Sequence, residues 1–285
     1  MPAERLRSVE APLPVKPMGS SGDYSTPAKL YDGYIFDLDG TCYLGDALLP
    51  TVGKTIAHLR ELGRRTIFLS NNPTQTREVY AERLTRLGLP TPPEDVINSS
   101  MVMVDFLRHR MPGARLFVVG EEPLRRELAE AGFDVADNAR DVAAVIASFD
   151  RTFDYRKLQI AFDAIRAGAR FFATNSDRYC PVPGGGQPDA AAVIAAIEAC
   201  TTVGVEAIVG KPSHYMAESV LERLGLAPHQ CLMVGDRLET DVLFGLNAGM
   251  DAALTLTGAT DEMMLASSTI RPTYVLRALS ELVPR

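Results

Sequence analysis

Two aspartates one residue apart follow an apolar run in the first quarter of the sequence. Residues 34–36 lead into Asp37 and Asp39, and Gly40 comes next. One such carboxylate can act as a nucleophile or metal ligand, while the other transfers protons. A calcium loop of the EF-hand type is disfavoured, because its glycine stands at position six and Gly40 stands at position four. The pattern therefore predicts catalytic carboxylates at the end of a strand.

Other polar residues follow apolar runs in the same way. They are Ser70 with Asn71, Lys211, and Asp236 with Asp241 five residues later. In an open parallel sheet, ligands bind beyond the carboxyl ends of the strands, where loops and helix N-termini gather. We therefore expect these residues to meet Asp37 in one site.

The combined charges of these residues indicate phosphate chemistry with a metal ion. A carboxylate that approaches a phosphate meets repulsion of about 4 kcal/mol per charge pair at ~4 Å and an effective dielectric constant of ~20. Lys211 and a divalent cation would offset that repulsion. Aspartate oxygens are ligands that Mg²⁺ prefers, and Ser70 can donate to a phosphate oxygen.

Strand and helix patterns alternate along most of the chain. The strands are expected at residues 34–38, 66–69, 116–119, 142–147, 171–173, 207–209, 231–234 and 252–256. Between them lie amphipathic runs, such as 155–167, and the alanine-rich run 190–199. In the helices, Leu62 is expected on an apolar face and Pro212 in a first turn. This alternation predicts parallel sheets joined by right-handed crossovers.

Composition and charge exclude several classes of protein. The formal net charge of −7 disfavours a nucleic-acid binder, which needs a basic footprint. No apolar run approaches the ~18 residues that a membrane span requires. Residues 1–30 are rich in Pro, Ser and Gly and are expected to form an extended arm without the apolar core of a signal peptide. We expect a cytoplasmic protein that binds neither nucleic acid nor membranes.

Four motifs in order resemble the haloacid dehalogenase superfamily of phosphohydrolases. They are residues 37–41, Ser70, Lys211, and residues 235–241. Residues 69–72 and the long insert after them are further similar to the NagD-like, p-nitrophenylphosphatase-like subclass with a C2-type cap. The resemblance implies an α/β fold with a Rossmann-like parallel-sheet core at 31–97 and 207–285. It places an inserted α/β cap domain at 98–206.

The same resemblance implies a role for each matching residue. Asp37 would attack phosphorus, and Asp39 would protonate the leaving oxygen and then activate water. Asp37, the main-chain carbonyl of Asp39, and Asp236 would bind Mg²⁺, while Asp241 would order the waters on the metal. The phosphoryl group would be held by Ser70, Asn71 and Lys211.

Several residues have simpler interpretations that stay open at this point. Ser70 could cap a helix, and Asp241 could be an acidic residue that opens one. Arg237 and Glu239 could form a solvated pair, and Gly184–Gly186 reads as a flexible cap loop. In the cap, four residues could contact the substrate or form an ordinary loop, namely Asn175, Asp177, Arg178 and Tyr179.

We therefore expect a Mg²⁺-dependent phosphatase that acts on a small phosphorylated metabolite through an aspartyl-phosphate. A sugar or polyol phosphate would be hydrolysed in this way, with p-nitrophenyl phosphate as a surrogate. One alternative is a phosphotransferase that uses the same intermediate, and another is a catalytically silent protein that binds phosphate ligands. The apolar faces of the cap helices would also allow a homodimer to form through the cap.

Overall fold

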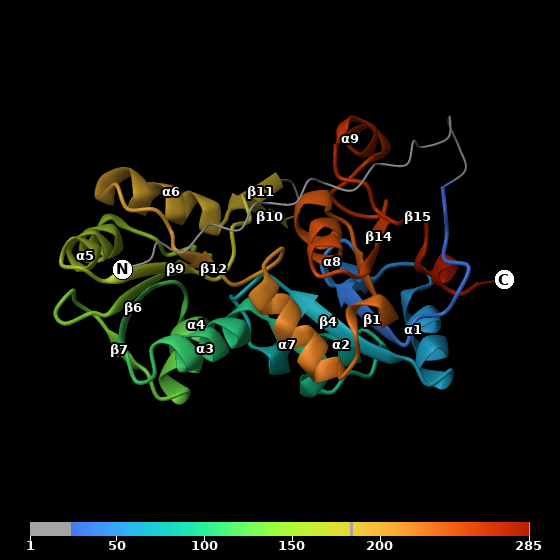
Figure 1. Ribbon diagram of the computed structural model, residues 1–285, viewed down its shortest axis with the longest axis horizontal. Coiled ribbons are helices and arrows are strands. Elements are labelled where there is room, and N and C mark those ends of the chain that lie inside the picture. The colour runs from blue at the N-terminus through green and yellow to red at the C-terminus, as the bar shows by residue number, and fades with distance from the viewer. Residues whose placement is uncertain (1–23, 183–184, 285) are drawn as a thin grey trace, which may run out of the picture.

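A computed structural model describes residues 24–182 and 185–284, which form two parallel sheets side by side (Figure 1). The core sheet has the strand order β15-β14-β13-β1-β4-β5, with every neighbouring pair parallel. Its strands are β1 (Gly33–Asp37), β4 (Arg65–Ser70), β5 (Val96–Asn98), β13 (Cys231–Gly235), β14 (Asp251–Thr255) and β15 (Tyr274–Leu276). Because β1 lies between β4 and β13, the ends of these three strands are adjacent.

The cap sheet is also parallel and has the order β12-β9-β8-β6-β7. Its strands are β6 (Arg115–Val119), β7 (Asp134–Ala136), β8 (Ala144–Ala147), β9 (Arg170–Ala173) and β12 (Ala207–Ile208). An antiparallel hairpin follows β9 and is made of β10 (Tyr179–Val182) and β11 (Gly185–Pro188). A smaller hairpin, β2 (Tyr43–Leu44) and β3 (Ala47–Leu48), follows β1.

Helices cover both faces of each sheet, so the strands are buried. The helices are α1 (Val52–Glu61), α2 (Arg77–Arg86), α3 (Ser99–Arg110), α4 (Glu122–Glu130), α5 (Tyr155–Arg166), α6 (Ala190–Thr201), α7 (His214–Leu224), α8 (Leu243–Asn247) and α9 (Glu262–Ser267). On the core sheet, α1 and α2 pack on one face, and α3, α7 and α8 on the other. On the cap sheet, α5 and α6 pack on one face, and α3 and α4 on the other. This layering is that of a doubly wound α/β fold.

One apolar cluster runs without a break from the core sheet to the cap sheet. It contains Ile67 of the core, Phe172 of the cap, and Phe106 of α3. The Phe106 ring makes edge contacts with Phe172 at 5.1 Å and with Tyr215 of α7 at 4.8 Å, measured between ring centroids. The two sheets therefore share a packed apolar side around α3.

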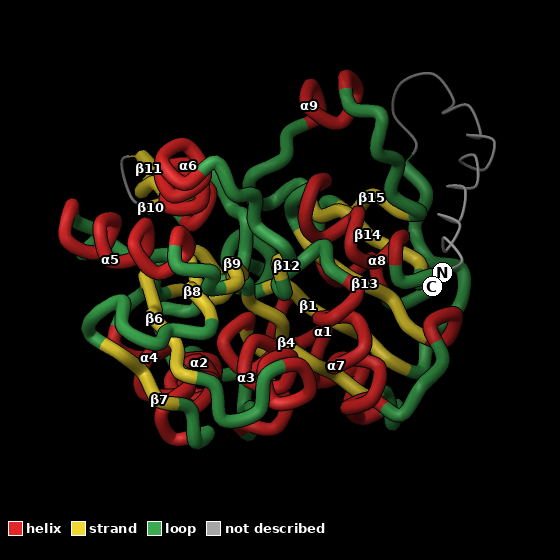
Figure 2. Tube along the Cα trace, turned by 60° about the vertical axis from the view of Figure 1, so that its left-hand side comes forward, coloured by secondary structure: helices red, strands yellow, loops and turns green. Residues whose placement is uncertain are grey.

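The structure corrects four expectations drawn from the sequence. The strand before Lys211, β12, pairs with β9 and so belongs to the cap sheet instead of the core (Figure 2). Pro212 precedes α7, which begins at His214 after the N-cap Ser213. Leu62 lies just beyond α1 and is 41% exposed. The glycine run expected as a loop forms part of strand β11 from residue 185 onward, paired with β10 in a hairpin, with residue 184 outside the described residues.

The expected N-terminal arm lies outside the described residues up to residue 23. From residue 24 the chain lies against the core, where the Val275 amide donates to the Ser25 carbonyl at 3.1 Å. Among the described residues, no helix has both the length and the apolar character that a membrane crossing requires.

Candidate active site

The predicted site residues meet where the core strands end beneath the cap. Asp37, Ser70 and Asp236 follow the adjacent strands β1, β4 and β13, and Lys211 follows β12. Asp37, Ser70 and Lys211 line a cavity of about 60 Å³ between core and cap, and Asp236 lies beside it. Its lining consists of Asp37, Asp39, Ser70, Asn71, Asn72, Asp177, Tyr179, Cys180, Pro181, Asp189, Lys211, Arg237, Thr240 and Asp241. Residues more than two hundred positions apart thus reach one small volume.

Lys211 lies at the bottom of this cavity and is 2% exposed. Its Nζ donates to Asp37 Oδ1 at 2.5 Å and to Asp241 Oδ1 at 2.6 Å. Burial works to lower the pKa of Lys211, but Asp241 and Asp37 outweigh it and raise that pKa above its usual value. Lys211 is therefore a permanent positive charge beside Asp37.

Asp241 organises the loop that leaves β13. Its Oδ2 accepts the main-chain N–H groups of Asp236 at 3.1 Å and Arg237 at 3.0 Å, while its Oδ1 faces Lys211. A single π-helical turn, Leu238–Val242, carries Asp241 back toward the strand end. The acid thus does more than open a helix, because both of its oxygens hold other parts of the site.

Asp236 has the features of a metal ligand. Its Oδ2 accepts the Ala259 N–H at 2.5 Å, but its Oδ1 is buried without a hydrogen-bond partner among the described residues. One carboxylate oxygen from each of Asp37, Asp236 and Asp241 lies within 4.8 Å of the others. Buried carboxylates are normally paired or bound to a metal. A hard cation with oxygen ligands fits this unsatisfied group.

Like charges and burial shift the acidic groups toward protonation. Burial raises the pKa of Asp37 well above its usual range. The positive charge of Lys211 opposes this shift, whereas the negative charges of Asp241 and Asp236 add to it. Burial also raises the pKa of Asp236 to about 7, and the negative charge of Asp241 is the second largest cause of this shift. The pKa of Asp39 is raised by burial too, although Arg83 opposes the shift. A raised pKa favours the protonated form of a carboxyl, which is the form that a general acid needs.

Ser70 and Asn71 lie at the end of β4. The Ser70 hydroxyl accepts the Asn72 N–H at 3.1 Å and lines the cavity. Ser70 is not a helix N-cap, since α2 begins seven residues later with Thr76 before it. The Asn71 side chain pairs with the main chain of Lys211: Oδ1 accepts its N–H at 2.7 Å, and Nδ2 donates to its carbonyl at 3.2 Å.

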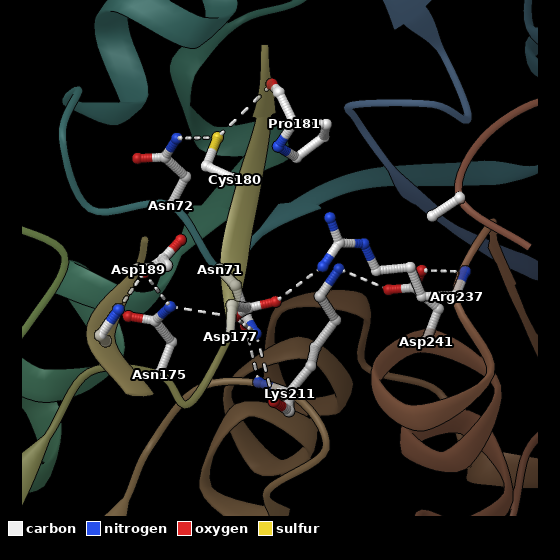
Figure 3. A network of polar contacts seen from close by, with 12 residues as sticks. Asn71, Asn72, Asn175, Asp177, Cys180, Pro181, Asp189, Lys211, Arg237 and Asp241 are labelled. Atoms are coloured by element: carbon white, nitrogen blue, oxygen red, sulfur yellow. Dashed lines mark hydrogen bonds and ion pairs between the residues drawn. The ribbon is translucent and has the colours of Figure 1, made fainter. Parts of the chain in front are cut away.

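Asp177 of the cap contacts the core directly across the cavity (Figure 3). Its Oδ2 accepts from Asn71 at 2.8 Å and from Asn175 at 2.9 Å, and its Oδ1 lies 3.5 Å from the Arg237 guanidinium. That guanidinium also lies 5.5 Å from the centre of the Tyr179 ring. Arg237 is therefore a bridge between core and cap instead of one half of a solvated pair with Glu239.

Of the cap residues proposed from the sequence, three lie at the site and one does not. Asp177 and Tyr179 line the cavity, and Asn175 is fully buried behind them. Arg178 is exposed and does not line the cavity. Sequence reasoning missed Asp189, which lines the cavity at the start of α6. Its only signal was an Asp before an alanine-rich run, which predicts no more than a helix N-cap.

Comparisons with known proteins agree with this fold and site. Residues 34–134 match the family model described as haloacid dehalogenase-like hydrolase, and residues 208–282 match a second one described as HAD-hydrolase-like. The sugar-phosphatase AraL of Bacillus subtilis is 35% identical, over 87% of this chain and 91% of its own length. The 5'-nucleotidase YutF of the same organism is 32% identical, over 90% of this chain and 99% of its own length.

Solved structures show the same likeness. The p-nitrophenyl phosphatase from Archaeoglobus fulgidus superimposes with a TM-score of 0.84 at 30% identity, covering 89% of this chain and 98% of that one. NagD from Escherichia coli K-12 superimposes with a TM-score of 0.82 at 29% identity, covering 90% of this chain and 100% of that one. The chain belongs to the haloacid dehalogenase-like hydrolases. Within them it falls in the subclass of NagD-like and p-nitrophenylphosphatase-like proteins, which have a core and a cap domain.

Proposed function

We propose that this chain is a Mg²⁺-dependent phosphatase that hydrolyses small phosphomonoesters through an aspartyl-phosphate. The family and the phosphatase names of its relatives support the reaction class. One observation carries the assignment to this site: the Lys211 ammonium lies between Asp37 and Asp241 beneath a cavity at the strand ends. A positive charge held beside a carboxylate allows that carboxylate to approach a phosphate.

In the proposed first step, an oxygen of Asp37 attacks phosphorus and the bond from phosphorus to the leaving oxygen breaks. Asp39 gives its proton to that oxygen, so an alcohol departs and Asp37 carries the phosphoryl group. Asp39 then takes a proton from water, whose oxygen attacks the same phosphorus. The bond to Asp37 breaks, which releases inorganic phosphate and restores both carboxyl groups. The raised pKa of Asp39 supports its part as the proton donor.

The phosphoryl oxygens would be held by Lys211, by the Ser70 hydroxyl and by Asn71. The Asn71 side chain is already paired with Lys211 and Asp177, so it acts mainly by fixing the position of the lysine. A buried, doubly hydrogen-bonded main chain at Lys211 keeps the ammonium in place without reorganisation during the reaction.

Asp37, Asp236 and the Asp39 carbonyl would hold Mg²⁺, and Asp241 would order its waters. The unpartnered Oδ1 of Asp236 supports this ligand set. When bound, the ion offsets the negative charge that gathers on the carboxylates and the phosphoryl group. The closed contacts of Asp241 with Lys211 and two main-chain N–H groups suit it to a supporting position.

Removal of divalent metal tests this proposal directly. With excess EDTA, turnover of p-nitrophenyl phosphate should fall by at least about 100-fold, because the phosphate then meets uncompensated carboxylates. Added Mg²⁺ should restore the rate in a saturable way, measured as release of p-nitrophenol. Full turnover in the chelated protein would exclude the metal-dependent mechanism.

Gly258 provides a test that changes none of the proposed ligand residues themselves. A Cβ at Gly258 would overlap the Asp236 carboxylate, so Gly258→Ala must displace that group. We expect the Mg²⁺ concentration for half-maximal activity to rise by at least about tenfold, since displaced ligands bind metal poorly. Gly204→Ala is the matched control, because its added Cβ would meet only Glu198 Oε1, at 3.8 Å. Equal Mg²⁺ requirements in the two variants would contradict Asp236 as a ligand.

We also propose a small phosphorylated metabolite as the substrate and the cytoplasm as the location. Its relatives include sugar phosphatases, a 5'-nucleotidase and p-nitrophenyl phosphatases, which supports the metabolite class. We place the cap at residues 98–208, moved by two residues to include β12. A homodimer through the cap stays a prediction that sizing in solution would test.

A further inference from the structure

Asp189 is a buried carboxylate in the wall of the active-site cavity. It stands between the β10–β11 hairpin and α6, and it is 4% exposed. It lines the same cavity as Asp37 and Lys211 but comes from the cap side (Figure 3). None of the phosphoryl-transfer steps proposed above uses it.

The contacts of Asp189 satisfy one of its oxygens and leave the other open. Oδ1 accepts the Ala190 N–H at 2.5 Å and the Asn175 Nδ2 at 3.0 Å. Within residues 24–182 and 185–284, no group donates to Oδ2 and no cation forms an ion pair with Asp189. Burial raises the pKa of Asp189 to about 6, so the group is still mainly ionised at neutral pH. Because Asp189 lines the cavity, Oδ2 is available to accept a hydrogen bond from a bound molecule.

Its position is fixed by a chain of buried polar groups. Asn175 is fully buried, and its Oδ1 accepts from the Thr174 hydroxyl at 2.9 Å. That hydroxyl is also within 2.8 Å of the Ser148 hydroxyl at the end of β8. Because Asn175 is held from behind, it orients Asp189 and cannot turn to supply a second donor.

The neighbouring charges do not neutralise Asp189 either. Arg237 is the cation on this part of the cavity wall, and its guanidinium already faces Asp177. The other oxygen of Asp177, Oδ2, accepts from both Asn71 and Asn175. After these pairs are matched, the cap side of the cavity retains one negative charge, on Asp189.

We propose that Asp189 determines specificity by accepting a hydrogen bond from the leaving group of the substrate. This inference rests on the proposed phosphatase function. The leaving group would carry a hydroxyl or an ammonium, as in polyol, sugar or amino-alcohol phosphates. An ester with a second anionic group would place like charges together in a buried space and would bind poorly.

A purely structural role for Asp189 makes a different prediction. As the N-cap of α6 it satisfies a main-chain N–H, and Asn or Ser at this position would do the same. Asp189→Asn keeps an acceptor for Ala190 and Asn175 but removes the charge. The variant therefore separates helix capping from substrate recognition. If Asp189→Asn does not fold, Asp189→Ser repeats the test with a smaller side chain at the helix N-cap.

The test compares kcat/KM at saturating Mg²⁺ for glycerol 3-phosphate, phosphoethanolamine and phosphoglycolate, with p-nitrophenyl phosphate as reference. The unchanged protein should prefer the donor-bearing esters to phosphoglycolate. In Asp189→Asn, kcat/KM for glycerol 3-phosphate or phosphoethanolamine, divided by kcat/KM for phosphoglycolate, should fall at least tenfold. The fall should come mainly from a higher KM for the donor-bearing ester. The response of the two donor-bearing esters distinguishes a hydroxyl from an ammonium, and a fall with either supports the inference.

Asp154→Asn is the matched control, since Asp154 caps α5 in the same cap and lies outside the active-site cavity. It should leave all ratios unchanged. An unaltered ratio in folded Asp189→Asn, or a preference of the unchanged protein for phosphoglycolate, would overturn this inference while the phosphatase function stands. Absence of turnover with every ester, p-nitrophenyl phosphate included, would overturn the proposed function and the inference with it.

Discussion

Asp37→Asn should lower kcat for p-nitrophenyl phosphate by about 10⁴-fold or more, because an amide cannot replace the attacking carboxylate. The loss should appear in kcat more than in KM, since Lys211 and Ser70 still bind the phosphoryl group. The variant should fold normally. In the unchanged protein, burial first, and then the charges of Asp241 and Asp236, raise the pKa of Asp37 in spite of Lys211. The charge on Asp37 is therefore costly to bury, and its removal should not unfold the chain.

Asp32→Asn is a suitable control for this experiment. Asp32 lies just before the opposite end of β1 and pairs with Arg64 on the surface at 2.7 Å. Loss of a half-exposed ion pair costs little, about 0–1 kcal/mol, and Asp32 is outside the cavity. Its turnover should match that of the unchanged protein. Full activity in folded Asp37→Asn would exclude Asp37 as the nucleophile.

Lys211→Met should abolish activity and also destabilise the metal-free protein. Lys211 is the shared partner of Asp37 and Asp241, all of them buried. Removing the cation from a buried ion pair leaves uncompensated charge and costs about 3 to 5 kcal/mol of unfolding free energy. Urea unfolding at pH 7.5 in EDTA measures this loss. Mg²⁺ should restore part of the stability but none of the activity, because the ion neutralises the carboxylates without replacing the ammonium.

Lys157→Met tests whether lost stability alone explains lost activity. Lys157 pairs with the buried Asp150 of the cap at 2.6 Å, so its removal should also lower the unfolding free energy. It lies outside the active-site cavity, and turnover below the unfolding range should be preserved. Comparable turnover in the two lysine variants would remove Lys211 from the phosphoryl-binding set.

The meeting of Asp37, Ser70 and Asp236 could be predicted from the sequence because each follows a buried strand. Parallel strands bring their carboxyl ends to one edge, so a local signal at each strand locates the whole cluster. The strand before Lys211 was harder. A two-residue strand such as Ala207–Ile208 carries no signal for which sheet it joins, and pairing with β9 was decided by the packing of the cap.

The residues that join core and cap could not be predicted in the same way. Arg237 meets Asp177 sixty positions away, and Asn71 meets it across 106 positions. These contacts depend on how two separately folded sheets face each other, which no local periodicity encodes. Leu62 illustrates a smaller limit: the apolar pattern continues one residue beyond α1, where Gly63 turns the chain and exposes the side chain.

The small cavity has a consequence for substrate affinity. Asp177 joins Asn71 and Arg237 across this cavity, so these polar contacts hold the cap to the core on the side of the active site. An opening of the cap at this side would have to break these contacts, while the continuous apolar packing around Phe106 lies on the other side.

An ester that binds only to an open form would have an apparent dissociation constant equal to the intrinsic value divided by the open fraction. Stronger Asp177 contacts across the cavity would then weaken substrate binding without touching the substrate.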